Sequence, residues 1–160
     1  GEIWFNGPNL IRGYWNRPDA TAEVLVDGWL RSGDVGRLDA EGFVYVEDRI
    51  KDMVLRGGEN VYCAEVEAAI HEHPAVHEVA VFGVPHDRLG EEVAAVVVPR
   101  AGASVTETEL VDFLAERLAP FKVPTRLRIR PEPLPRNAAG KFLKRDLRRE
   151  EEAASASATA

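Results

Sequence analysis

The sequence has one cysteine, four histidines and no long apolar run, and each shortage excludes a class of protein. A single cysteine, Cys63, cannot form an internal disulfide framework. The histidines lack the Cys or carboxylate spacing of a zinc site, so we predict no metal site in this chain. The longest apolar stretch, Val93–Val98, is far shorter than the roughly 20 residues that a membrane helix requires. We therefore expect no transmembrane segment and, by default, a cytoplasmic location.

The charge is distributed unevenly along the chain. The 160 residues carry a formal net charge of −7. Residues 122–149 nevertheless hold ten basic and two acidic side chains, a local balance of +8, so the rest of the chain carries −15. A basic segment on an acidic body suits a small polyphosphate ligand, whereas a nucleic-acid binder more usually carries a broad basic face. We expect no nucleic-acid partner. The alternative explanation is an ordinary solvated C-terminal helix, which accounts for about half of these basic residues.

Residues 1–50 have the pattern of strands that cannot close a core by themselves. Pro18 opens a short helix and Asp27-Gly28 follows its end. Residues 38–43 connect two strands as a hairpin. Two or three strands with several aromatic side chains on fewer than about 50 residues do not bury those side chains. We infer that partner strands are missing and that the chain is the end of a longer protein.

From Met53 onward the pattern is that of a self-sufficient domain. Residues 64–73 place apolar side chains on one helical face, and Pro74 stops that helix. Thr106 and Glu109 form a capping box that opens a second amphipathic helix. These two helices need a sheet to pack on.

The strands of that sheet are predicted over residues 79–84, 93–98 and 126–130, from apolar runs and from alternation. Helices packed on a small mixed sheet make an α+β module of about 90 residues, within the size range of domains. The small and polar residues 151–160 are predicted to be a disordered tail.

Three short motifs follow one another along the chain: Arg31–Asp34 (RSGD), Asp48–Tyr62 (DRIKDMVLRGGENVY) and Leu134–Lys141 (LPRNAAGK). Each has an ordinary explanation when taken alone, as a turn aspartate, a surface charge pair beside a two-glycine turn, and a loop lysine. In this order and spacing they resemble the junction between the two domains of AMP-forming acyl-CoA synthetases, members of the adenylate-forming enzyme superfamily.

The resemblance implies a division into domains. Residues 1–50 would be the C-terminal remnant of the large N-terminal adenylate-forming domain, from its β-barrel subdomain, and residues 51–150 the mobile C-terminal domain. The family's Ser/Thr/Gly-rich phosphate loop, its adenylate-binding segment and its acyl pocket are missing from this sequence. The resemblance therefore implies that the chain requires the missing N-terminal domain and is inactive alone.

The resemblance also assigns roles around the nucleotide and the hinge. Asp34 would accept hydrogen bonds from the ribose hydroxyls, which suits an ionised carboxylate, and Arg49 would help to hold the nucleotide. Lys51 would be the hinge about which the C-terminal domain rotates; its alternative is a surface pair with a neighbouring aspartate. Gly57 and Gly58 would line the tunnel for the pantetheine arm of coenzyme A, and a tight turn there is compatible with that role.

In the third motif the resemblance makes Lys141 the catalytic residue. Its ammonium would enter the active site as negative charge builds up on the phosphoryl oxygens, and a lost donor of this kind costs on the order of 10²–10³ in rate. Three positions depart from the family's usual residues. Ser32 and Asn137 replace threonine, and Cys63 replaces proline as a tolerated small apolar residue at a helix start, without a partner that would make it a nucleophile.

The implied function is that of an ATP-dependent acyl-CoA synthetase for a fatty or aromatic acid. A carboxylic acid and ATP would give acyl-adenylate and pyrophosphate, and the domain would then rotate so that the thiol of coenzyme A displaces AMP. Mg²⁺ would be bound mainly by the missing N-terminal domain. The alternatives are an adenylation domain that transfers the acyl group to a carrier protein, and a noncatalytic truncated domain.

Overall fold

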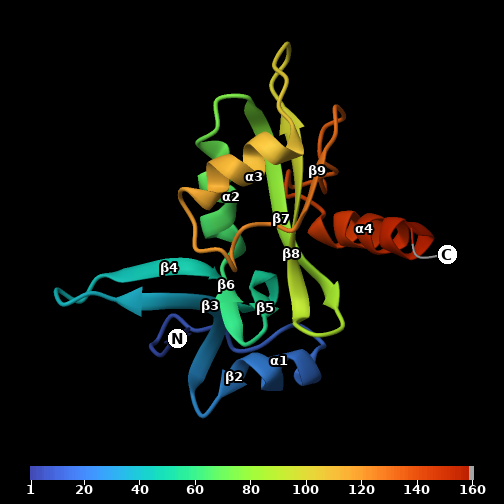
Figure 1. The fold of residues 1–160 in the computed structure, drawn as a ribbon. Helices are drawn as coiled ribbons and strands as arrows, with labels where there is room; N and C mark the ends of the chain where they lie inside the picture. Colours follow the sequence, from blue (N-terminus) through green and yellow to red (C-terminus); the bar gives the residue numbers. More distant parts are fainter. Residues whose placement is uncertain (159–160) are drawn as a thin grey trace. The chain divides into compact units, whose positions relative to one another are not determined.

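The protein is described over residues 1–158 by a computed structural model. The chain divides into two compact units, Gly1–Lys51 and Asp52–Ala160 (Figure 1). We predicted a boundary after residue 50, one residue before this division. Each unit has its own sheet, of four strands in the first and five in the second.

The first unit is an antiparallel sheet built around one long strand, β3 (Trp29–Leu38). Strands β1 (Glu2–Phe5), β2 (Leu25–Val26) and β4 (Val44–Arg49) all pair with β3. The hairpin predicted between β3 and β4 is therefore present. Helix α1 (Pro18–Val24) begins with proline at its first turn, where the missing N–H costs nothing.

Large apolar side chains of the first unit remain in contact with water. None of its described hydrophobic side chains is fully buried, and seven of its aromatic residues are at least 42% exposed: Trp4, Phe5, Tyr14, Trp15, Trp29, Phe43 and Tyr45. A sheet normally buries one face against a second layer. This exposure supports the inference, made from the sequence, that partner strands are missing.

The second unit is a mixed five-stranded sheet in the order β6–β5–β8–β7, with β9 also paired to β8. Its strands are β5 (Val54–Arg56), β6 (Glu59–Val61), β7 (Val76–His86), β8 (Gly90–Pro99) and β9 (Arg126–Ile129). Strand β9 runs parallel to β8, whereas the other pairs are antiparallel. The predicted α+β class with a small mixed sheet is confirmed.

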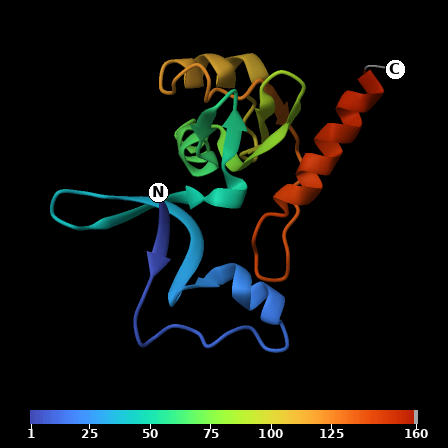
Figure 2. The same cartoon turned by 90° about the horizontal axis from the view of Figure 1, so that it is seen from below.

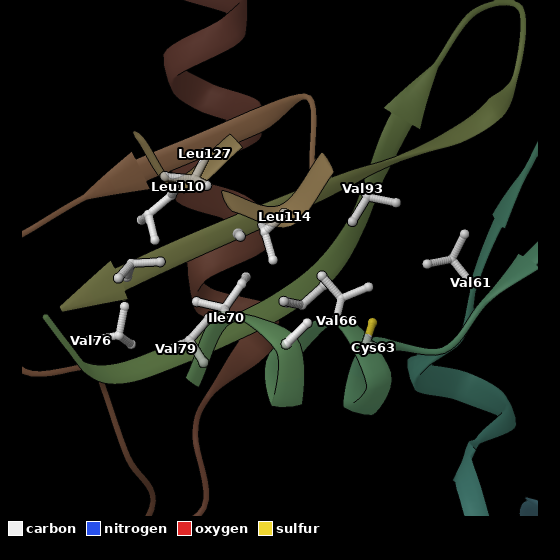
Figure 3. Packing of buried hydrophobic residues seen from close by; sticks show 14 of the residues in the cluster. Val61, Cys63, Val66, Ile70, Val76, Val79, Val93, Leu110, Leu114 and Leu127 are labelled. Atoms are coloured by element: carbon white, nitrogen blue, oxygen red, sulfur yellow. The ribbon is translucent and has the colours of Figure 1, made fainter. Parts of the chain in front are cut away.

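Strands β7 and β8 are buried on both faces, which explains why their sequences are continuous apolar runs. On one face, helices α2 (Cys63–His71) and α3 (Glu107–Ala115) cover the sheet, and Ile70, Leu110 and Leu114 are fully buried there. Figure 3 shows these side chains gathered between the two helices and the sheet. The capping box predicted for α3 is present.

The opposite face of the same strands carries a smaller cluster. Helix α4 (Lys144–Ala158) contributes Leu147, which is fully buried, and Leu134 comes from the segment before α4. They pack with the residues of β7 and β8 whose side chains point away from α2 and α3, since successive strand residues alternate between faces. Figure 1 shows α4 set apart from α2 and α3 across the sheet.

Helix α4 extends into the segment that we predicted to be a disordered tail, residues 151–160. That prediction is wrong up to the end of α4, and the last two residues lie outside the described part of the chain. Glu150 and Glu151 both pair with Arg128 of β9, at 3.0 and 2.6 Å. These long-range ion pairs favour the helix and are invisible in local composition. The high helix propensity of alanine favours it as well.

Leu114→Ala tests the larger cluster. Because Leu114 is fully buried, the substitution leaves a cavity and should lower the free energy of unfolding by about 2–5 kcal/mol. Leu55→Ala, at a side chain 51% exposed on the same unit, should change it by less than about 0.5 kcal/mol. Urea unfolding followed by circular dichroism measures the free energy of unfolding of both variants. Equal losses in the two variants would show that Leu114 of α3 does not contribute to the core as proposed.

Candidate functional site

The structure brings together the two residues that we predicted to hold the nucleotide. Asp34 of β3 lies opposite Arg49 of β4 in the strand register, and Arg49 Nε donates to Asp34 Oδ1 at 3.1 Å. The side chain of Asp34 is 28% exposed, and its Oδ2 has no hydrogen-bond partner among the described residues. A carboxylate oxygen oriented by a guanidinium and still able to accept is suited to hydroxyl groups.

The backbone before Asp34 bends at Gly33, whose φ is +73°, a conformation that glycine adopts without strain. Ser32 Oγ stabilises this bend, because it donates to the carbonyl of Ile3 at 2.8 Å and accepts from the N–H of Asp34 at 2.9 Å. The hydroxyl that serine shares with threonine is therefore used to fix the position of the aspartate.

An open pocket of about 570 Å³ lies beside this pair on the first unit. Its charged lining residues are Glu2, Glu23, Arg31, Arg49 and Lys51. Glu2 forms an ion pair with Arg31 at 3.2 Å, and Arg49 is paired with Asp34 at 3.1 Å. Lys51 is therefore the cation of the lining that no ion pair among the described residues offsets.

Lys51 belongs to the 3₁₀ turn η1 (Ile50–Asp52), at the division between the two units. The neighbouring Asp52 belongs to the same turn. A short turn between two elements can absorb a change in backbone torsions, as a hinge must. The hinge role stays a prediction.

Gly57 and Gly58 form the turn between β5 and β6, with φ values of +60° and +89°. Both values lie in the region that favours glycine, and two such residues in sequence suit a two-residue hairpin turn. The N–H of Gly57 donates to the carbonyl of Leu89 at 2.8 Å. A Cβ at position 58 would meet no atom within 4 Å, so that glycine leaves open space beside the backbone.

Lys141 lies at the end of a narrow loop that precedes α4 (Figure 2). Asn137 closes this loop, since its Oδ1 accepts from the N–H groups of Ala139 and Lys141, both at 3.0 Å. The N–H of Asn137 donates in turn to the carbonyl of Lys141 at 2.9 Å. The side chain of Lys141 has no partner among the described residues, so its ammonium remains available to a ligand.

The sequence analysis overlooked two residues that attach this loop to the sheet. Arg136 Nη2 lies 2.7 Å from Glu78 Oε1 on β7, and Arg136 Nη1 donates to the carbonyl of Gly140 at 2.8 Å. Glu78 and Arg136 are 58 positions apart in sequence. Only an argument from charge pairing across the sheet could have suggested them.

A second ion pair fixes the start of α4. Lys144 Nζ lies 2.8 Å from Glu67 Oε1 on α2, and the same oxygen accepts from the N–H of Val81. Burial lowers the pKa of Lys144, but the neighbouring Glu67 carboxylate outweighs it and leaves that pKa above its usual value. Cys63 is fully buried and its Sγ lies 2.7 Å from the carbonyl oxygen of Asp52, which fits the predicted packing role at the start of α2.

Residues 1–158 contain no group of three His, Cys, Asp or Glu side chains that could hold a metal ion. No described helix combines the length and the apolar character needed to cross a bilayer.

Residues 65–141 match the family model of the AMP-binding enzyme C-terminal domain. The chain is 50% identical over 151 residues to a long-chain-fatty-acid–CoA ligase of Bacillus subtilis, covering 94% of this chain and 27% of that protein. It is 50% identical over 149 residues to a feruloyl-CoA synthase of Amycolatopsis, covering 93% and 30%. A solved o-succinylbenzoate CoA synthetase of Bacillus subtilis, in complex with its acyl-adenylate intermediate, has a TM-score of 0.85 at 43% identity, covering 92% and 30%.

These similarities identify residues 65–141 as an AMP-binding enzyme C-terminal domain. Over at least 92% of its length the chain is similar to CoA ligases and CoA synthetases. It spans less than a third of the length of these relatives.

Glu78→Gln tests the ion pair that attaches the loop. Burial raises the pKa of Glu78, but hydrogen bonds from Leu134 N–H and Arg136 outweigh burial and hold that pKa below its usual 4.5. The charge of Glu78 therefore stabilises the fold above about pH 4.5, and this contribution is lost as the pH falls through the lowered pKa. Urea unfolding between about pH 3 and pH 7 should show the variant less stable by about 1 kcal/mol at pH 7, with the difference shrinking in acid.

Glu132→Gln is the control, because Glu132 is 67% exposed in a 3.7 Å pair with Arg130. Its stability should follow that of the unchanged chain at every pH. The ion pair is contradicted if the free energy of unfolding of Glu78→Gln differs from that of the unchanged chain by the same amount at every pH down to about pH 3.

Proposed function

We propose that this chain is the C-terminal part of an ATP-dependent acyl-CoA synthetase that forms an acyl-adenylate and then an acyl-CoA. The observation that carries the proposal is Lys141, whose backbone is held by hydrogen bonds on both sides while its ammonium has no protein partner among the described residues. An anchored loop with a solvated cation is the device expected where negative charge develops on phosphoryl oxygens.

In the first step, an oxygen of the substrate carboxylate attacks the α-phosphorus of ATP, and pyrophosphate leaves. Lys141 would stabilise the charge that builds up on the phosphoryl oxygens and on the leaving pyrophosphate. Asp34 would orient the nucleotide through the ribose hydroxyls, with Arg49 holding the carboxylate in place. The structure of a relative bound to its own acyl-adenylate supports this order of steps.

In the second step, the thiolate of coenzyme A attacks the acyl carbonyl carbon, and AMP leaves. The second unit would rotate about Lys51, which lies at the division between the units, and the Gly57–Gly58 turn would then border the pantetheine arm. A turn without side chains leaves room for such an arm. Mg²⁺ would be held mainly by the N-terminal domain together with the phosphates of ATP.

The acid substrate is proposed only as a class, a fatty or an aromatic carboxylic acid. Relatives at the same identity are named for a long-chain fatty acid and for feruloyl-CoA, so this part of the protein does not choose between them. Coenzyme A is favoured over a carrier protein as acceptor because these relatives are named as CoA ligases or synthases. We also propose that the chain requires an N-terminal domain for activity. A cytoplasmic location is proposed as well, and it fits the single cysteine.

Lys141→Ala tests the first step in a hybrid in which this chain replaces the matching segment of the Bacillus subtilis long-chain-fatty-acid–CoA ligase. Acid-dependent exchange between ATP and pyrophosphate should fall by about 10²–10³, because the cation is lost where charge develops. Formation of acyl-CoA from supplied acyl-adenylate should persist. Arg145→Ala, which removes a nearby cation that is 86% exposed, is the control and should leave both rates unchanged.

The proposal fails if the hybrid shows no exchange with its fatty acid, or if Lys141→Ala leaves exchange intact. A loss of both half-reactions together would indicate a structural role for Lys141 instead.

Asp34→Ala in the same hybrid should raise the KM for ATP by about tenfold, since the ribose would lose a charge-assisted hydrogen bond worth about 1.5–3 kcal/mol. The KM for the fatty acid should not change. Asp39→Ala serves as control, because Asp39 caps the tip of the β3–β4 hairpin through the N–H groups of Glu41 and Phe43. An unchanged KM for ATP in Asp34→Ala would remove Asp34 from the nucleotide site.

A further inference from the structure

The loop that carries Lys141 is connected to the sheet through the guanidinium of Arg136. One side of this group meets Glu78 Oε1 of β7 at 2.7 Å, and the other donates to the carbonyl of Gly140 at 2.8 Å. Gly140 directly precedes Lys141. A continuous path of two strong contacts therefore runs from strand β7 to the residue next to the proposed catalytic lysine.

The side chain of Glu78 is held in a fixed position on strand β7. Strand β7 pairs Glu78 with Val98 of β8, and the Glu78 side chain is only 12% exposed. Its second oxygen accepts from the N–H of Leu134 at 2.8 Å, and Leu134 is itself buried in the smaller cluster. The carboxylate is thus held by two donors and has little freedom to move with the loop.

The remaining contacts of the loop close it upon itself. Asn137 bonds to Ala139 and Lys141 within the loop, and the N–H of Leu143 donates to the carbonyl of Pro135 at 2.8 Å. The ring of Phe142 lies 4.1 Å from the Arg136 guanidinium carbon and packs against its face. These contacts set the shape of the loop, whereas the ion pair with Glu78 sets its orientation on the sheet.

We propose that Glu78 and Arg136 are positioning residues that aim Lys141 during adenylate formation, an inference that rests on the proposed function. The lysine side chain is long and exposed, so the direction in which it points depends on the backbone that carries it. A displacement of about 1 Å in a catalytic group can lower a rate by on the order of 10². Without the charge on Glu78 the Arg136 guanidinium loses its fixed partner, and the loop can rotate.

Glu78→Gln in the hybrid separates positioning from simple stability. The variant keeps the shape of the side chain and an oxygen that can accept from Leu134, and it loses only the charge that holds Arg136. Exchange between ATP and pyrophosphate should fall by about tenfold, mainly in its maximal rate and with little change in the KM for ATP. Acyl-CoA formation from supplied acyl-adenylate should keep its rate, because that step does not use Lys141.

Glu92→Gln is the matched control. Glu92 lies on the neighbouring strand β8, its side chain is 13% exposed, and it pairs with Arg126 at 3.3 Å, away from the Lys141 loop. Its pKa is lowered as that of Glu78 is, because hydrogen bonds from Thr125 and Arg126 outweigh the raising effect of burial. The control should show the same modest loss of stability in urea and an unchanged exchange rate.

The double variant Glu78→Gln with Lys141→Ala gives the sharpest test. If Glu78 acts through Lys141, the double variant should exchange no more slowly than Lys141→Ala alone, since the two losses are not additive. Hydrogen–deuterium exchange of peptides covering residues 136–143 should also be faster in Glu78→Gln than in Glu92→Gln.

The inference is overturned if Glu78→Gln leaves exchange unchanged while Lys141→Ala abolishes it, or if the two losses multiply in the double variant. Equal losses in both half-reactions would assign Glu78 a purely structural role and would overturn it as well. If Lys141→Ala itself leaves exchange intact, the proposed function fails first, so the two failures are distinguishable.

Discussion

The burial of strands β7 and β8 on both faces is the constraint on which the second unit depends. Their buried apolar side chains alternate between a cluster under α2 and α3 and a cluster under α4. Cores of this kind are close-packed and resist displacement. Glu78 and Glu67 use this rigidity, because each carboxylate extends from a buried element to a cation at one end of the Lys141 segment.

The first unit differs from the second in how far its apolar side chains are buried. Strands β1, β2 and β4 all pair with β3, yet the tryptophans and tyrosines of this unit remain in contact with water. Such exposure is costly for an isolated unit and normal for a sheet that packs against more protein. The limited coverage of the relatives, less than a third of their length, agrees with this interpretation. Asp34 and Arg49, which we propose face the nucleotide, are thus held by strand register and not by a core.

Much of the fold could be predicted because its signals are local. The capping box at Thr106 and Glu109, the proline at the start of α1 and the apolar runs of β7 and β8 each depend on a few neighbouring residues. The tail was predicted wrongly for the opposite reason. Its composition suggests disorder, whereas its helix is held by ion pairs to Arg128 on a strand distant in sequence.

The sequence by itself determined the class of fold, most helices and strands of the second unit and the three motifs. Motif residues are chosen by the chemistry they perform, so their types and spacing are visible without coordinates. Only the tertiary structure decided that Asp34 meets Arg49 and that Arg136 joins Glu78 to the backbone before Lys141. Such pairs depend on which strands become neighbours, and that is set by burial over the whole domain, not by any local pattern.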